Sequence, residues 1–230
     1  MPIERCTLGV SGLDQCIEGG LLRGSSNLVA GGPGSGKSIL CMQFLVDGAV
    51  KGENGMYVSF EEDETQMAQN FSPFGWELDK LVKGGKIMLK YFSPEHVATY
   101  LKAPVDPLLD TVRQYNVKRI VIDSASGYEI LFDSDYSRRV GLLKLLESLK
   151  KYGATILITS ERDLSTEAPN FIEFLVNGAI VLYNTRQGSQ RGRGIEVLKM
   201  RATNHTQKIM PMKIDKKGIT VYPDELFFQA

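Results

Sequence analysis

The sequence has no excess of charge of either sign. Its 230 residues include 27 Lys and Arg and 27 Asp and Glu, so the formal net charge at pH 7 is zero. A neutral chain has no overall attraction to nucleic acid or to an anionic membrane surface, although a local basic patch is compatible with this balance. The composition therefore argues against functions that need a strongly charged protein.

Cysteine is scarce as well. Cys6, Cys16 and Cys41 are an odd number without C-x-x-C spacing, which argues against a disulfide framework and against a cysteine metal site. We expect buried free thiols in a reducing cytoplasm. No apolar run is long enough to act as a signal peptide or to span a bilayer, so we predict a cytoplasmic protein without membrane association.

The chain also lacks internal repeats, low-complexity segments and interdomain linkers. Its length and its hydrophobic content of 43% are ordinary for a globular protein with a large core. We therefore predict a single domain over residues 1–230.

Residues 31–38, Gly-Gly-Pro-Gly-Ser-Gly-Lys-Ser, fit the P-loop pattern G-x-x-x-x-G-K-[ST] at every fixed position. The apolar residues 26–30 before it predict a buried strand, and the apolar spacing after it predicts a helix. Glycines let backbone N–H groups approach phosphate oxygens, and the helix N-terminus adds partial positive charge. Lys37 is expected to reach the β- and γ-phosphates, and the Ser38 hydroxyl is expected to ligate Mg²⁺.

Further apolar runs predict strands at residues 56–60, 86–92, 118–124, 154–160 and 179–183, alternating with helices. One helix is predicted from about residue 63 to 74. A second, at 136–152, would turn five leucines inward: Leu142, Leu143, Leu145, Leu146 and Leu149. Strands dominate the last third, at 195–201, 209–214 and 219–222, after a predicted hairpin tip that holds Arg186, Arg191 and Arg193. This order predicts an α/β fold with a mostly parallel central sheet flanked by helices and a C-terminal antiparallel β extension.

Carboxylates follow two of the predicted strands. Acidic residues suit the first turn of a helix, which explains Asp63 and Glu64. Glu61 and Glu62 follow the carboxyl end of the strand at 56–60, where α/β sheets place ligand chemistry, so a catalytic role and a helix-start role both stay open. Asp123 ends the strand at 118–124, and behind a P-loop this pattern is typical of a Walker B carboxylate that holds the Mg²⁺ site.

Two groups of polar residues near the ends of later strands have alternative interpretations. The residues after the strand at 154–160, including Glu161, are candidates for sensing a γ-phosphate. Lys199 and Arg201 fall on one face of the predicted strand at 195–201. They are either the solvent side of an edge strand or cations that reach a phosphate on a neighbouring subunit.

The sequence resembles the RecA-like ATPases, and within them the KaiC family, over nearly the whole chain. The resemblance is carried by the P-loop, the strand that ends in Asp123 and several shorter motifs. These motifs are Gly12-Leu13-Asp14 with Gly19-Gly20, Phe60-Glu61-Glu62, Phe74-Gly75-Trp76 and Lys199-Met200-Arg201-Ala202-Thr203-Asn204-His205. The resemblance implies a RecA-like P-loop NTPase core and a homo-oligomer, a hexameric ring with ATP between its subunits.

The resemblance also implies roles for individual residues. Glu61 and Glu62 would be the catalytic carboxylates, and one of them would polarise the attacking water. Lys199 and Arg201 would act in catalysis from the neighbouring subunit and balance charge that develops in phosphoryl transfer. The nucleotide and its Mg²⁺ would be bound by Gly34, Ser35, Gly36, Lys37, Ser38, Ile39, Met200, Thr203, His205, Asp215 and Lys216, with Ser38 and Asp123 at the metal.

One departure concerns self-phosphorylation. The family's clock member is modified on adjacent Ser and Thr ahead of a late strand, where this chain has Glu173-Phe174-Leu175-Val176 without hydroxyls. We therefore expect no self-phosphorylation at these positions, and nothing in the sequence marks the nearby Ser165 and Thr166 as acceptors.

The first hypothesis is a slow Mg²⁺-dependent ATPase that assembles as a ring. The alternative is a nucleic-acid-binding, recombinase-like or repair accessory protein, whose contacts would come from the loops at 127–137 and 162–171. The first of these loops is acidic, which argues against phosphate contact. A third hypothesis keeps the ATPase and adds an unidentified protein partner whose binding is gated by ATP.

Overall fold

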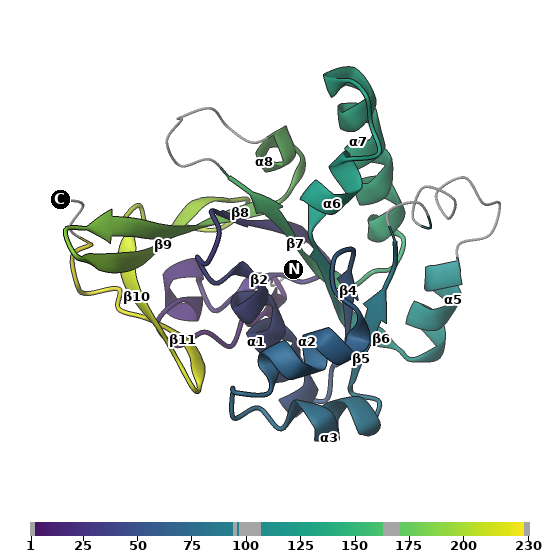
Figure 1. The fold of residues 1–230 in the computed structure, drawn as a ribbon, viewed down its shortest axis with the longest axis horizontal. Helices are drawn as coiled ribbons and strands as arrows, with labels where there is room; N and C mark the ends of the chain where they lie inside the picture. The colour runs from purple at the N-terminus through teal and green to yellow at the C-terminus, as the bar shows by residue number, and fades with distance from the viewer. Residues whose placement is uncertain (1–2, 94–95, 97–106, 163–170, 228–230) are drawn as a thin grey trace.

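The computed structural model describes residues 3–93, 96, 107–162 and 171–227. Within these residues nine strands form one sheet, in the order β11-β10-β9-β8-β3-β7-β6-β4-β5 (Figure 1). Six neighbouring strands are parallel: β8 (Gly178–Gln187), β3 (Ser26–Gly31), β7 (Thr155–Glu161), β6 (Val117–Asp123), β4 (Asn54–Ser59) and β5 (Ile87–Tyr91). Three antiparallel strands extend the β8 edge: β9 (Gln190–Met200), β10 (Met210–Asp215) and β11 (Gly218–Val221).

Helices cover both faces of the parallel strands (Figure 1). One face carries α1 (Lys37–Val50), α2 (Glu64–Phe71) and α3 (Leu78–Lys83). The other face carries α5 (Pro107–Gln114), α6 (Ala125–Glu129), α7 (Asp135–Lys150) and α8 (Phe171–Leu175). None of the described helices is long and apolar enough to cross a membrane.

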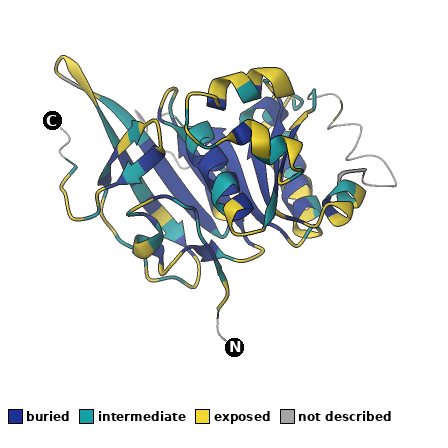
Figure 2. Ribbon diagram, turned by 90° about the horizontal axis from the view of Figure 1, so that it is seen from below, coloured by how far each residue is buried: buried dark blue, intermediate teal, exposed yellow. Residues whose placement is uncertain are grey.

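The sheet separates two apolar layers. In β3, Leu28 and Ala30 join the layer under α5 to α8, while Val29 between them joins the layer under α1 to α3. A strand buried on both faces is expected at the centre of a parallel sheet, because helices cover each side. Figure 2 shows this burial along the central strands.

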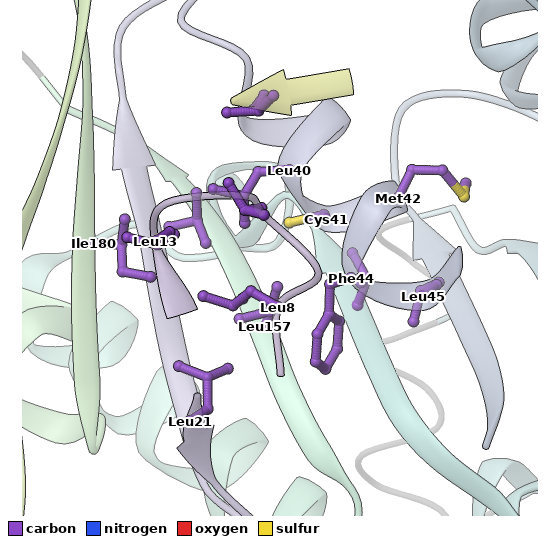
Figure 3. Close-up of a cluster of buried hydrophobic side chains, with 14 of the residues drawn as sticks. Leu8, Leu13, Leu21, Leu40, Cys41, Met42, Phe44, Leu45, Leu157 and Ile180 are labelled. Carbon is purple, nitrogen blue, oxygen red and sulfur yellow. The ribbon is translucent and has the colours of Figure 1, made fainter. Parts of the chain in front are cut away.

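A short N-terminal unit closes the layer beside α1. It consists of β1 (Arg5–Cys6), the 3-10 helix η1 (Asp14–Ile17) and β2 (Leu21–Leu22), and β1 pairs with β2 in a separate two-stranded sheet. Figure 3 shows Leu8, Leu13 and Leu21 of this unit among the side chains of α1 and of the central strands. The unit is therefore part of the main core and not a loose extension.

One charged side chain is buried near the amino ends of the central strands. Arg119 of β6 is 1% exposed, and its Nε lies 2.6 Å from Glu53 Oε2 while Nη1 lies 3.0 Å from Asp47 Oδ2. Nη1 also donates to the carbonyls of Thr7 and Phe44, at 2.8 and 2.7 Å. A buried charge needs partners of this kind, because an unpaired one loses its hydration and gains no interaction that compensates for it.

The predicted fold class is confirmed, and several details were wrong. Leu143 is 40% exposed, whereas the other four leucines assigned to the inner face of α7 are buried. Residues 125–129 form α6, so the loop predicted at 127–137 is shorter. Arg191 and Arg193 belong to β9, because the β8–β9 ladder continues to the pair Gln187 and Gln190. Residues 163–170, with Ser165 and Thr166 and most of the second predicted loop, lie outside the described residues.

Candidate functional site

The P-loop lies between the carboxyl end of β3 and the start of α1. Gly34 and Gly36 have φ of 68° and 106°, in the left-handed region that glycine adopts without strain. A Cβ on Gly36 would lie 2.8 Å from Ile214 Cδ1 of β10. Glycine is therefore favoured at residue 36 chiefly by backbone conformation, because the end of the Ile214 side chain could move aside for a Cβ.

The loop presents positive partial charge to a common space. Gly36 caps α1 without a side-chain hydrogen bond, and no acidic residue lies in the first turn of this 14-residue helix. Lys37 Nζ donates to the carbonyls of Gly31 and Gly32, at 2.9 and 3.3 Å. Ser35 is fully buried, and its Oγ has no hydrogen-bond partner in the described part of the chain. This arrangement suits an anion such as a phosphate group.

Asp123 gathers three hydroxyl groups at the carboxyl ends of neighbouring strands. Ser38 Oγ donates to Asp123 Oδ2 at 2.7 Å, the Tyr57 hydroxyl donates to the same oxygen, and the Thr159 hydroxyl donates to Oδ1. Burial, reinforced by the Asp123 carboxylate, raises the pKa of Tyr57 well above its usual value, so Tyr57 stays a donor. Asp123 is therefore held close to the P-loop serine.

Glu61 and Glu62 lie directly after β4, and both line a cavity of about 130 Å³ with Lys37, Ser38 and Asp123. The Ser59 hydroxyl accepts from the backbone N–H groups of both glutamates, at 3.2 and 2.9 Å. Two carboxylates, a lysine, a serine and an aspartate from three segments of the chain thus meet in one space.

The two glutamate side chains have different partners. Ser124 Oγ donates to Glu61 Oε1 at 2.9 Å, which holds this carboxylate beside Asp123. Asn70 Nδ2 of α2 lies 3.0 Å from each oxygen of Glu62. The helix-start role belongs to the next residue, because Asp63 caps α2 and accepts from Gln66 N at 2.8 Å. The capping interpretation is therefore confirmed for Asp63.

A second cavity, of about 410 Å³, opens on the other side of the P-loop. Its lining combines Gly34 to Ile39 with Arg193 of β9 and Ile214 of β10. The Asp215–Gly218 turn follows at this end of the sheet, where the Lys216 carbonyl accepts from Gly75 N at 2.9 Å. Asp215 and Lys216 therefore lie on the same side of the sheet as the P-loop of their own chain.

The block from Lys199 to His205 lies at the opposite end of the sheet. Met200 pairs with Gly178, and Arg201 N donates to the Asn177 carbonyl at 2.9 Å. Asn177 N in turn donates to the carbonyl of Ser26 at the start of β3. Since Gly31 is five residues further along β3, Arg201 is separated from the beginning of the P-loop by ~16 Å along the strand direction alone.

The side chains of this block have different surroundings. Met200 is 6% exposed and packs in the core. Burial and the neighbouring Arg201 lower the pKa of Lys199 from its ordinary value. Thr203 Oγ1 donates to the Arg201 carbonyl at 3.2 Å, and His205 Nδ1 lies 2.9 Å from the Thr206 carbonyl. Any contact of Met200 with a ligand would therefore use its backbone.

Four residues of the site were not predicted from the sequence. Tyr57 and Thr159 were predicted to lie in buried strands, and Ser124 to follow a Walker B carboxylate, but in the structure each of the three donates a hydrogen bond to a carboxylate. Arg193 was predicted to lie at a hairpin tip. The polar residue inside or at the end of an otherwise apolar strand was the available signal for the first three.

Comparisons of the sequence and the fold with known proteins identify the family of this chain. The sequence profile described as "ATPase: KaiC" matches residues 6–226. The chain belongs to the KaiC family of ATPases. The circadian clock oscillator protein KaiC of Synechococcus elongatus is 33% identical over 225 residues, and that of a Picosynechococcus strain is 34% identical over 232 residues.

The lengths of these KaiC relatives differ from that of the present chain. The alignments cover 93% and 96% of this chain but only 43% and 45% of the two relatives, so it spans less than half their length. The crystal structure of a KaiC-like protein from Pyrococcus horikoshii superimposes with a TM-score of 0.85 at 33% identity. That match covers 96% of this chain and 100% of the other.

Proposed function

We propose that this KaiC-family protein is a slow Mg²⁺-dependent ATPase that works as a homo-oligomeric ring with ATP at its subunit interfaces. One observation carries the proposal: Lys37, Ser38, Asp123 and the two glutamates line one cavity, while the cations Lys199 and Arg201 lie at the far end of the sheet. Family membership supports nucleotide binding. The ring, the dependence on Mg²⁺ and the slow hydrolysis of ATP are proposed in addition.

The P-loop residues fit a triphosphate and its metal. The buried Ser35 hydroxyl without a partner and the uncapped start of α1 offer donors to phosphate oxygens. Ser38 and Asp123 offer the oxygen atoms that Mg²⁺ prefers, and Mg²⁺ usually completes its shell with water and substrate phosphates. The described residues hold no group of three or more His, Cys, Asp or Glu that could bind a metal alone. When bound, the metal would neutralise charge on the phosphates.

The protein groups have separate tasks in this proposal. Lys37 would leave the carbonyls of Gly31 and Gly32 to bind phosphate oxygens. Asp123, fixed by the hydroxyls of Tyr57 and Thr159, would keep Ser38 oriented. Glu61 would accept a proton from the attacking water, because its carboxylate lies beside Asp123 in the cavity.

The distance along β3 supports completion of the site by a second subunit. Arg201 is separated from the P-loop of its own chain by ~16 Å along the strand direction, which is further than an arginine side chain reaches. Lys199 and Arg201 would instead face the nucleotide of the neighbouring protomer, with Thr203 and His205. Asp215 and Lys216 would contact the nucleotide from the turn after β10.

Two measurements test the proposal. Light scattering with Mg-ATP is expected to give a mass several times that of the protomer, and the Lys199→Ala/Arg201→Ala variant is expected to bind ATP but to lose turnover. A protein that stays monomeric under saturating Mg-ATP, or a variant with wild-type turnover, would refute the interface role. Binding of single-stranded DNA at low salt, lost as salt is raised, would support the nucleic-acid alternative.

A partner protein is a further part of the proposal. In a nucleotide-gated module, ATP would set the conformation or assembly of the ring, and hydrolysis would reset it. A pull-down in which the recovered protein changes between ATP and ADP would support this gating, and identical recovery in both would oppose it.

A further inference from the structure

We propose that Arg5 and Glu18 form a clamp that positions the loop at residues 201–205 for the nucleotide of the neighbouring subunit. The clamp consists of two side chains from the N-terminal unit, one on β1 and one at the end of η1. It lies far in sequence from the loop, and neither side chain belongs to the nucleotide site itself. The inference rests on the proposed function, because it assigns these residues to the interface site.

Arg5 holds the loop from one side. Its Nη1 donates to Thr203 Oγ1 at 2.8 Å, and its Nη2 donates to the Ala202 carbonyl at 3.3 Å. The same guanidinium donates to the carbonyl of Gly20 at 3.1 Å and pairs with the Glu18 carboxylate. The side chain is only 14% exposed, although an unpaired arginine would extend into water. A planar group with several donors can fix two segments to each other in this way.

Glu18 holds the loop at the residue after Thr203. One of its oxygens accepts from Arg5, and the other accepts from Asn204 N at 3.3 Å. The loop is further fixed at its ends, where Arg201 N donates to Asn177 O at 2.9 Å and Thr206 N donates to Cys16 O at 3.2 Å. Three successive loop residues therefore contact one ion pair.

The loop needs such support because its backbone is unusual. Ala202 has a φ of 50°, in the left-handed region that residues with a Cβ rarely adopt. The hydrogen bond of Arg5 to the Ala202 carbonyl acts at this residue. Without the clamp, the segment that carries Arg201 and Thr203 would relax toward more common backbone conformations. A cation that must meet a developing charge loses its effect when it is misplaced by about an ångström.

Arg5 is a positioning residue in this inference, since it touches the loop and not the nucleotide. The Arg5→Ala variant is expected to bind ATP and to lower kcat about tenfold or more with a smaller change in KM. Arg23→Ala is the matched control, because Arg23 lies on the same N-terminal unit and pairs with Glu4 and Glu53 instead. Its kcat is expected to stay within about twofold of wild type.

A mixing experiment separates an interface role from a merely structural one. Arg5→Ala subunits are mixed 1:1 with Glu61→Gln/Glu62→Gln subunits, which retain the clamp but lack the catalytic carboxylates. At about one interface in four, the intact glutamates of the first subunit meet the intact loop of the second. Turnover is therefore expected to rise in the mixture to about a quarter of the wild-type rate, above either variant alone.

A control mixture distinguishes failure of the clamp from failure of the proposed function. Arg201→Ala subunits mixed with the same glutamate variant are expected to recover turnover as well. If Arg201→Ala recovers and Arg5→Ala does not, the clamp is overturned while the proposed function stands. If neither recovers, the interface function fails and the clamp fails with it. Wild-type kcat in Arg5→Ala alone also overturns the clamp.

A second variant serves if Arg5→Ala does not fold. Arg5→Lys keeps the positive charge beside Glu18, but one ammonium cannot reach the Gly20 carbonyl, the Ala202 carbonyl and Thr203 together. It is expected to melt close to wild type, to lose kcat, and to recover turnover in the same mixture. Full activity of Arg5→Lys would show that charge alone suffices and would overturn the positioning role.

Discussion

The roles of Glu61 and Glu62 can be distinguished by single substitutions to glutamine. Glu61→Gln and Glu62→Gln each keep size and hydrogen-bonding shape and remove one carboxylate. Ser124 Oγ, at 2.9 Å, can still donate to the amide oxygen of Gln at residue 61, so the local structure is expected to survive. The negative charge and the ability to accept a proton are lost.

The structure predicts unequal losses. The Glu61 carboxylate is held beside Asp123, and removal of a general base typically costs about 10²- to 10⁴-fold in rate, or about 3–5 kcal/mol in barrier height. The Glu62 carboxylate is bonded to Asn70 on α2. Its replacement exchanges a charge-assisted hydrogen bond for a neutral one, a difference of about 1 kcal/mol, so we expect no more than about a fivefold loss.

Phosphate release at saturating Mg-ATP measures kcat, and equilibrium binding of ATP serves as the control for a damaged P-loop. Both variants are expected to bind ATP with affinities within about threefold of wild type, since neither glutamine removes a P-loop group. A larger kcat loss in Glu62→Gln than in Glu61→Gln, or wild-type kcat in both, would refute the assignment of the base.

Two further predictions concern stability and the shape of the P-loop. Arg119→Met is expected to lower the free energy of unfolding by about 2–4 kcal/mol at neutral pH, because it removes the buried guanidinium that pairs with Asp47 and Glu53 and leaves the Thr7 and Phe44 carbonyls without this donor. Burial alone would raise the pKa of Glu53, but hydrogen bonds from Arg119 and a second arginine lower it. The stability that comes from the lowered pKa is present above the ordinary pKa of a glutamate and is lost as the pH falls. The difference in free energy of unfolding between wild type and Arg119→Met, measured in urea, should therefore narrow below about pH 4. Gly36→Ala is expected to weaken ATP binding about tenfold or more by displacing the loop, whereas Gly52→Ala, also at positive φ but with open space around it, should leave affinity unchanged in the same calorimetric titration. An unchanged difference in free energy of unfolding in acid, or equal affinities in the two glycine variants, would contradict these arguments.

The elements built from local chemistry were predictable. The P-loop, its strand and its helix follow from glycine spacing and from apolar runs, and the alternation of strands and helices predicts a parallel sheet. Asp123 could be placed beside Ser38 before any coordinates, because the carboxyl ends of parallel strands meet at one edge. These inferences need no knowledge of distant contacts.

Features that depend on distant contacts were not predictable. Leu143 is an error of another kind, because Leu142, Leu145, Leu146 and Leu149 follow the i, i+3, i+4, i+7 spacing and Leu143 lies outside it, so helical periodicity could have excluded it. The β8–β9 hairpin looked short because its tip is rich in glycine and arginine, yet cross-strand pairing extends it. Arg5 gave no signal at all, since its partners at Ala202 and Thr203 are almost two hundred residues away.

The parallel and the antiparallel strands of the sheet carry different candidate functional residues. The parallel strands carry the phosphate loop and the carboxylates, all at their carboxyl ends. β9 passes this chain's own P-loop at Arg193, near its start, and ends at the opposite end of the sheet with Met200. Because the two ends of β9 lie at opposite ends of the sheet, the proposal assigns the residues after Met200 to the nucleotide of a neighbouring subunit. The clamp at the N-terminal unit would support the loop at that end of the sheet, in addition to the hydrogen bond from Arg201 N to the Asn177 carbonyl.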